Sequence, residues 1–336
     1  MFFTSLTNIN NVVGEEDLMD VKKLAQTLLK RGEQKAASDL YILPYQGGYR
    51  LTYRYHHDVE IYQTLNQELG EKIVLYLKYL GGMDIAEKRK AQGGSATISF
   101  GKSRIRIRLS SVGDYQNKET LVIRFLKNQQ KGSTYHYVFN EQYDELKDQI
   151  RQGGLYLFSG PTGAGKSTTM YQLATDLRKE QQIITIEDPV EIEHQDFVQF
   201  EVNPKIDLTY EALIKVCLRH RPDILIIGEI RDQETAKMVV RAALTGHTVF
   251  STIHGNNRES VWLRLLDFGI PEIELKQCLK GIVYQELIKV ERDCRYAVLY
   301  DYVMNGVETD WQKSVQKAYE TKTISKEVYE KFRVYS

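Results

Sequence analysis

Residues 155–168 read LYLFSGPTGAGKST, a short apolar run followed by a glycine-rich turn that ends in Lys166 and Ser167. The turn fits the pattern G-x-x-x-x-G-K-[ST] in full, and a helical segment, Thr168–Leu177, follows it. Backbone N–H groups in such a loop point at anionic oxygens, and the N-terminus of the next helix adds partial positive charge. The stretch therefore predicts a strand, a phosphate-binding loop and a helix, with a nucleoside triphosphate as the ligand.

The residue types in this loop suit that chemistry. The glycines let the backbone curl, Lys166 can reach the β- and γ-phosphates, and the Ser167 hydroxyl can ligate Mg²⁺. A glycine turn that only mimics the pattern is the alternative, and the strand–loop–helix context argues against it. We expect a nucleoside triphosphate and Mg²⁺ as ligands. The predicted nucleotide-binding residues of the loop are Gly160, Pro161, Thr162, Gly163, Ala164, Gly165, Lys166, Ser167 and Thr168.

Apolar runs around the loop predict the architecture of the C-terminal part. Short, nearly continuous apolar strands that alternate with helices are typical of a parallel sheet covered on both faces. The predicted strands are Leu155–Ser159, Ile183–Glu187, Ile224–Gly228 and Thr248–Ile253. A helix is expected at Asn140–Gln152 ahead of them, and helices of lower apolar content after about Asn305.

The N-terminal part follows a different pattern. Apolar spacing predicts one helix at Leu18–Arg31 and a second from about Leu65 to Leu80. Alternating segments predict strands at Leu40–Leu43, Tyr49–Tyr55, Ala96–Phe100, Arg104–Ser110 and Thr120–Leu126, the first two joined as a hairpin at Gly47-Gly48. Two helices beside a small antiparallel sheet make an α+β module.

Length and charge support a division into two domains. The 336 residues suggest about two domains. The 45 basic and 45 acidic residues cancel overall, but residues 21–127 carry 19 basic and 10 acidic, whereas residues 128–336 carry 26 and 31. We expect a flexible leader at 1–20, an α+β domain at 21–127, a linker at 128–133 and an ATPase domain with C-terminal helices at 134–336.

The cysteine count and the apolar runs exclude several classes of protein. Cys217, Cys278 and Cys294 are too few and too widely spaced for a disulfide framework or a four-thiolate zinc site. No apolar run approaches the roughly 18 residues that span a bilayer. The sequence therefore predicts that the protein works in a reducing compartment and binds no zinc.

Two acidic segments follow predicted strands. Glu229 comes after Ile224–Ile227, and Glu187, Asp188 and Glu191 come after Ile183–Ile186. Open α/β sheets bind ligands at the carboxyl ends of their strands, so these carboxylates can serve phosphoryl transfer. A helix cap or a surface ion pair is the alternative for any one of them.

Two histidines, His247 and His254, flank one predicted strand. A hydrogen-bonded structural histidine is the alternative to a functional one. Neither histidine has a Cys or a carboxylate at metal-ligand spacing, which argues against a zinc site.

Four segments in this order resemble the secretion ATPases of the type II secretion and type IV pilus family. Residues 160–169, GPTGAGKSTT, resemble its Walker A motif, and residues 186–191, IEDPVE, its Asp box. Residues 225–232, LIIGEIRD, resemble Walker B, and residues 243–254, ALTGHTVFSTIH, the His box. The resemblance implies an α/β fold: a RecA-like P-loop ATPase domain with a parallel-rich sheet, preceded by a small α+β, PAS-like N-terminal domain.

The resemblance also implies that the nucleotide is ATP, with ATP and Mg²⁺ as cofactors, and it implies a role for each matching residue. Lys166 and Ser167 would bind phosphate and Mg²⁺, Glu191 would activate water, and Glu229 would hold Mg²⁺ through water. The catalytic residues expected on this basis are Glu191, Glu229, Lys166 and His254.

Five further residues, together with His254, would assist them. Glu187 and Asp188 would support the metal and water shell, and His247 and His254 would couple the nucleotide state to domain movement. Arg108 and Arg124 match arginines that reach the triphosphate from the N-terminal domain. A solvated strand face is the alternative for these arginines, since Arg104 and Arg106 alternate with Arg108.

Departures from the family pattern indicate which members of the family the chain resembles most. The chain has no tetracysteine insertion, Gln285-Glu286-Leu287 stands where Gln-Arg-Leu is usual, and only Arg54 remains of an Arg-x-Arg-x-Asp-Gly string. Such a chain is most similar to the competence-pilus members of Gram-positive bacteria. That likeness implies a homohexameric cytoplasmic ATPase, peripheral at the inner face of the membrane, that acts on a polytopic platform protein to build a pilus for DNA uptake.

Three rival readings follow from the same residues. A retraction or secretion-type ATPase would share the fold and the ATP site. A non-hydrolysing regulatory scaffold would fit the replaced arginine at Glu286. A motor that binds DNA directly would fit the basic N-terminal module, although we expect no direct, specific nucleic-acid binding.

Overall fold

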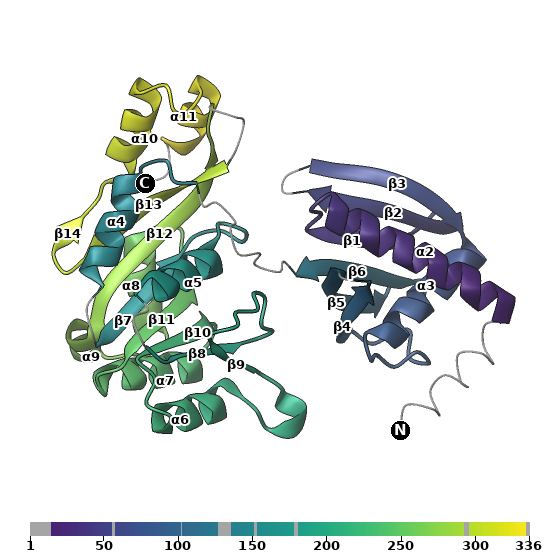
Figure 1. The fold of residues 1–336 in the computed structure, drawn as a ribbon, viewed down its shortest axis with the longest axis horizontal. Helices are drawn as coiled ribbons and strands as arrows, with labels where there is room; N and C mark the ends of the chain where they lie inside the picture. The colour runs from purple at the N-terminus through teal and green to yellow at the C-terminus, as the bar shows by residue number, and fades with distance from the viewer. Residues whose placement is uncertain are drawn as a thin grey trace. The chain divides into compact units, whose positions relative to one another are not determined.

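The computed structural model describes residues 15–55, 58–101, 103–126, 136–150, 153–177, 181–291 and 296–333. The chain divides into two compact units, residues 1–128 and 129–336 (Figure 1). The predicted linker 128–133, most of the predicted leader and Cys294 lie outside the described residues. Among the described helices, none is long and apolar enough to cross a membrane.

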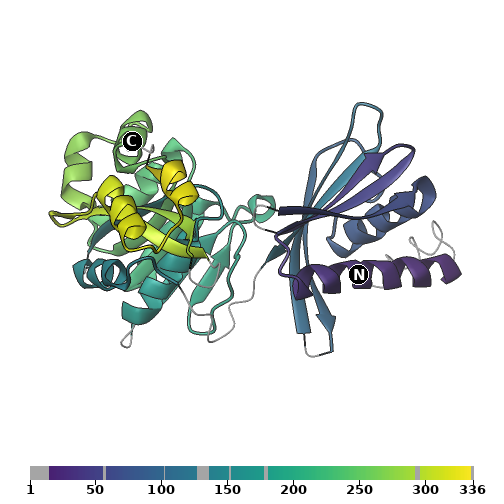
Figure 2. The ribbon, with the colours of Figure 1, turned by 90° about the horizontal axis from the view of Figure 1, so that it is seen from above.

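The first unit is a six-stranded antiparallel sheet with two helices on one face (Figure 2). The strand order is β3-β2-β1-β6-β5-β4. Its elements are α2 (Glu15–Gln34), β1 (Asp39–Tyr45), β2 (Gly48–Tyr55), β3 (Asp58–Asn66), α3 (Gln67–Leu80), β4 (Gln92–Phe100), β5 (Ser103–Gly113) and β6 (Glu119–Leu126). This confirms the predicted hairpin and α+β class, whereas the PAS-like character stays a prediction.

The sheet buries one face because its strands alternate. Leu40, Ile107 and Ile123 are fully buried on the helix side. Tyr53 is also buried there, and its hydroxyl donates to the Leu28 carbonyl of α2 at 2.8 Å. The apolar face therefore holds α2 and α3 against the sheet.

Several boundaries in this unit differ from the predictions. Helix α2 begins at Glu15, inside the segment expected as a leader. Strand β3 was not predicted, and the helix expected from Leu65 begins at Gln67, where Asn66 caps it by accepting from the Leu69 N–H. Edge strand β3 leaves Val59 and Ile61 more than half exposed, so it lacks the burial pattern that marks a strand in sequence.

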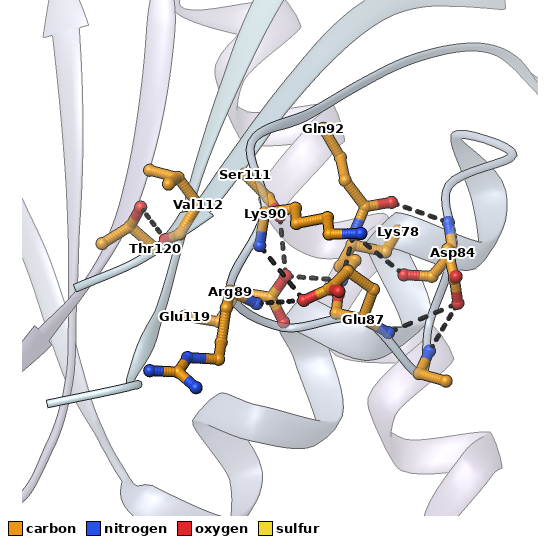
Figure 3. Close-up of polar contacts among 11 residues, drawn as sticks. Lys78, Asp84, Glu87, Arg89, Lys90, Gln92, Ser111, Val112, Glu119 and Thr120 are labelled. Carbon is orange, nitrogen blue, oxygen red and sulfur yellow. Dashed lines mark hydrogen bonds and ion pairs between the residues drawn. The ribbon is translucent and has the colours of Figure 1, made fainter. Parts of the chain in front are cut away.

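A buried ion pair fastens α3 to the sheet (Figure 3). The Lys78 ammonium lies 2.5 Å from the Glu119 carboxylate at the start of β6, and both side chains are under a tenth exposed. Ser111 donates to the same carboxylate oxygen at 2.7 Å, and Lys78 also donates to the Glu87 carbonyl at 2.7 Å. The pair therefore links α3, β5, β6 and the loop before β4.

The second unit is an eight-stranded sheet in the order β14-β13-β12-β7-β11-β10-β8-β9. Pairing is parallel from β12 to β9 and antiparallel at β13 and β14. Its strands are β7 (Gly154–Ser159), β8 (Ile183–Glu187), β9 (Val198–Glu201), β10 (Ile224–Ile230), β11 (Thr248–Ile253), β12 (Leu279–Lys289), β13 (Tyr296–Met304) and β14 (Val307–Glu308).

Helices cover both faces of this sheet (Figure 1). They are α4 (Asn140–Gln149), α5 (Lys166–Leu177), α6 (Tyr210–Arg219), α7 (Gln233–Leu244), α8 (Arg258–Asp267), α9 (Glu272–Cys278), α10 (Trp311–Glu320) and α11 (Lys326–Phe332), with a short 3-10 turn at Pro204–Ile206. The predicted α/β class with a parallel-rich sheet is confirmed. The strands β9, β12, β13 and β14 were not predicted.

Replacing Lys78 while keeping Glu119 should destabilise the first unit. We expect Lys78→Met to cost about 3 kcal/mol of unfolding free energy, because it leaves a carboxylate buried without its partner. Since Trp262 and Trp311 both lie in the second unit, the measurement is hydrogen exchange of β5 and β6 amides during a urea titration.

Two controls accompany this variant. Lys72→Met removes a surface i,i+4 pair with Glu68 on the same helix and should cost about 0.5 kcal/mol or less. The double variant Lys78→Met/Glu119→Leu should recover part of the loss. Equal urea midpoints for Lys78→Met and the wild type would contradict the assignment.

Candidate nucleotide-binding site

The glycine-rich loop leaves β7 at the carboxyl edge of the parallel strands and leads into α5. Gly160, Gly163 and Gly165 have φ values of 138°, 83° and 84°, which side-chain-bearing residues rarely adopt. A Cβ atom on Gly160 would lie 2.2 Å from the Gln285 carbonyl oxygen of β12. The loop therefore requires glycine for its backbone conformation and, at Gly160, for space.

Gln285 also supports the loop with its side chain. It is fully buried, and its Nε2 donates to the Ala164 carbonyl at 2.7 Å. Sequence reasoning treated Gln285 only as part of a family string and gave it no role. Its position within the mostly apolar stretch Ile282–Ile288 was the available signal.

Lys166 lies across the loop. Its ammonium donates to the carbonyls of Gly160 at 2.8 Å and Pro161 at 2.9 Å. Burial lowers the pKa of Lys166, while the carboxylates of Glu229 and Glu191 act in the opposite direction. The two carboxylates predicted for hydrolysis thus act electrostatically on the predicted phosphate-binding lysine.

Glu229 stands where β10 ends. A register shift after Ile227 accommodates Gly228, whose carbonyl accepts from the Thr252 hydroxyl at 2.7 Å. The Glu229 carboxylate accepts from the Arg231 guanidinium, and its other oxygen lies 2.6 Å from Nε2 of His254. His254 follows β11, so the parallel pairing of β10 with β11 brings the two predicted residues together.

Arg231 joins this group to the neighbouring strand. Its guanidinium lies 3.6 Å from the Asp188 carboxylate, just after β8. The sequence prediction gave Arg231 no role, although its place two residues after Glu229 was visible. His254, Glu229, Arg231 and Asp188 therefore form one polar row along the carboxyl edge.

Glu187 and Glu191 have different surroundings, although only three residues separate them. Glu187 is 6% exposed, and burial raises its pKa even though it accepts from Tyr171 at 2.5 Å and Thr185 at 2.7 Å. Glu191 is exposed. Glu187 therefore belongs to a buried network behind the site, whereas Glu191 is open to solvent.

His247 does not join the other predicted residues of this unit. It precedes β11, where Thr248 pairs with Gly154 at the start of β7, so it lies at the amino edge of the sheet. Its Nδ1 contacts the Thr245 hydroxyl at 3.1 Å. A six-residue strand separates it from His254, and residues at opposite ends of a strand cannot share one site.

Glu286, which replaces the usual family arginine, is buried on the side of β12 away from the loop. It accepts from the Tyr284 hydroxyl, and burial raises its pKa. Its hydrogen bond is to Tyr284, whereas Gln285 supports the phosphate-binding loop, so the replacement leaves that support intact.

The predicted arginines lie on the first unit, on the sheet face away from its helices. Arg108 faces Arg124 across the β5–β6 pair, and Arg124 faces Asp39 across the β6–β1 pair. Nε of Arg124 lies 2.9 Å from the Asp39 carboxylate. Arg54 faces Asp39 from its other side, so three arginines and one aspartate form a row.

The donor set fits ATP and Mg²⁺. A glycine loop with left-handed residues, an ammonium at its mouth and the start of the twelve-residue α5 suit phosphate oxygens. Ser167 in the first turn of α5 and Glu229 are oxygen donors of the kind that Mg²⁺ takes. Within the described ranges, no group of three or more His, Cys, Asp or Glu side chains converges on a metal position.

Comparison with known proteins identifies the family. Residues 14–333 match the family model described as Type II/IV secretion system protein. The chain is 45% identical to competence protein ComGA of Streptococcus pneumoniae, over 80% of this chain and 85% of that protein. It is 34% identical to type II secretion system protein E of Pseudomonas aeruginosa, over 83% of this chain and 56% of that protein.

A solved structure shares the fold. The ATPase DotB of Yersinia pseudotuberculosis superposes with a TM-score of 0.73 at 19% identity, over 94% of each chain. The family resemblance predicted from the four motifs is thus confirmed, and so is its likeness to competence members. The chain belongs to the type II/IV secretion system protein family and is one of its ATPases.

Proposed function

We propose that this ATPase drives assembly of a competence pilus, a type IV-like pilus for DNA uptake in transformation. It would work as a homohexamer at the cytoplasmic face of the cell membrane, against a polytopic platform protein. The observation that carries the hydrolytic part is that parallel pairing of β7, β11 and β10 brings the glycine-rich loop and Glu229 to the same edge of the sheet. The 45% identity to a competence protein supports the pilus part.

The phosphate-binding loop and the carboxylates would have different roles in hydrolysis. The loop amides, Lys166 and Thr168 would hold the phosphates, and Ser167 and Glu229 would hold the metal, Glu229 through water. Bound Mg²⁺ supplies positive charge that neutralises phosphate oxygens. Glu191 is exposed and would accept a proton from the attacking water.

The supporting residues would act around that reaction. Asp188 would help to order the metal and water shell, and buried Glu187 would support it from behind. His254 contacts Glu229 and would report the state of the nucleotide. His247 would contribute to coupling only from the opposite edge of the sheet.

The arginines of the first unit would turn hydrolysis into movement. Arg108 and Arg124 would close on the triphosphate, and Asp39 would orient Arg124. Arginines that close on a triphosphate stabilise charge and release when the charge changes, which makes a switch. The resulting domain rotation would act on the platform protein.

Replacing Glu191 tests the hydrolytic role. We expect Glu191→Gln to keep ATP binding but lower the rate of phosphate release by about a hundredfold or more, because the amide cannot accept the proton. Phosphate release and fluorescent nucleotide binding are measured on the purified full chain, with Glu193→Gln, an exposed glutamate on the same loop, as the control. Wild-type hydrolysis by Glu191→Gln would refute the assignment.

The same variant tests the cellular role. Cells that carry Glu191→Gln should lose pilus formation and transformation together. Loss of pilus withdrawal alone would favour a retraction motor, and loss of protein secretion alone a secretion ATPase. A wild-type chain that releases no phosphate would favour a regulatory scaffold.

Replacing the arginines tests the proposed clamp. We expect Arg108→Ala and Arg124→Ala each to lower the hydrolysis rate by about tenfold or more, since each removes charge stabilisation from the triphosphate. Arg89→Ala, an exposed arginine of the same unit, is the control and should leave the rate unchanged. Steep, salt-dependent DNA binding that these variants abolish would instead favour the DNA-binding reading.

A further inference from the structure

Edge strand β9 directs two alternate side chains at the loop that carries Glu191. The Gln199 carboxamide accepts from the His194 N–H at 2.7 Å and donates to the Ile192 carbonyl at 2.8 Å. The Glu201 carboxylate accepts from the Val190 N–H at 3.2 Å. The backbone is therefore held on both sides of Glu191, at the residue before it and the residue after it.

Gln199 also reaches the helix that follows the phosphate-binding loop. Its Nε2 donates to the Tyr171 hydroxyl at 2.8 Å, and that hydroxyl donates to Glu187 at 2.5 Å. Tyr171 is 1% exposed and lies one turn after Ser167 on α5. A continuous chain of hydrogen bonds thus runs from the loop of Glu191 to the helix of the phosphate-binding loop.

His194 adds a second connection to the same helix. Its Nε2 lies 3.4 Å from the Thr175 hydroxyl, and its ring stacks on Phe197 with centroids 3.9 Å apart. Thr175 and Tyr171 are four residues apart and therefore lie on one face of α5. The loop 188–197 is thus fastened to α5 at two successive turns.

We propose that Gln199 is a positioning residue for hydrolysis, which with Tyr171 fixes the place of Glu191 relative to the phosphate-binding helix. The inference rests on the proposed function, in which Glu191 accepts a proton from water. A general base must stand within hydrogen-bond reach of that water, and a displacement of about 1 Å can cost a hundredfold in rate. Gln199 itself touches neither the phosphates nor the water.

The test is Gln199→Met in the full chain, which keeps the length of the side chain and removes its hydrogen bonds. We expect the turnover number to fall by about tenfold or more, while the ATP dissociation constant stays within about twofold, because the phosphate-binding loop is unchanged. Hydrogen exchange of the His194 amide should become faster, since its acceptor is gone. Gln195→Met, the same change at an exposed position of the loop, should match the wild type in all three measurements.

Tyr171→Phe provides a second, smaller change. It removes one hydroxyl from the chain of bonds and should lower turnover in the same selective way. If both residues act through one chain, the double variant should lose less than the product of the two single losses. If the double variant loses the full product of the two single losses in turnover, the two residues act independently, and the inference is overturned.

Two other results would overturn it. One is unchanged turnover in Gln199→Met. The other is a fall in turnover matched by equal falls in ATP affinity and melting temperature, which marks a purely structural contact. Glu191→Gln separates the two proposals: wild-type hydrolysis by that variant sinks the proposed function, whereas an inactive Glu191→Gln beside a fully active Gln199→Met sinks only this inference.

Discussion

Parallel pairing of β7, β11, β10 and β8 is the constraint on which the site depends. The carboxyl ends of parallel strands lie at the same edge of a sheet, so the loops that follow these strands all begin at that edge. The glycine loop, His254, Glu229 and Asp188 come from four strands that are adjacent in the sheet but distant in sequence. These groups lie close together because the backbone hydrogen bonds of the sheet fix where each strand ends.

The buried strands could be predicted from the sequence because a strand that is buried on both faces consists of a continuous run of apolar residues. β7, β8, β10 and β11 all show it. The edge strands β3 and β9 have one buried residue and none, respectively, and β12 carries Gln285 and Glu286 inside it, so no continuous apolar run marks these three strands. The motifs on the loops could be predicted because their chemistry demands particular residues at fixed spacing.

The sequence could name candidate residues for the site, but it could not give their arrangement. Lys166 and Glu229 could be grouped because each ends or follows a buried strand. His247 and His254 were both grouped with them by motif alone, and only strand direction separates His247 from the site. Gln199 and Tyr171 act through hydrogen bonds between elements that are distant in sequence, and no spacing rule reveals such contacts.

The row of charges on the first unit has a thermodynamic consequence. Arg108 and Arg124 are cross-strand neighbours, and like charges in that position repel, so folding of this sheet stores electrostatic work that the Asp39 carboxylate, 2.9 Å from Arg124, offsets only in part. An anion that enters the row releases that work, and linkage then requires the anion to stabilise the folded sheet. If Arg108 and Arg124 close on phosphate as proposed, the first unit would be most stable with phosphate bound and would lose that added stability at each release.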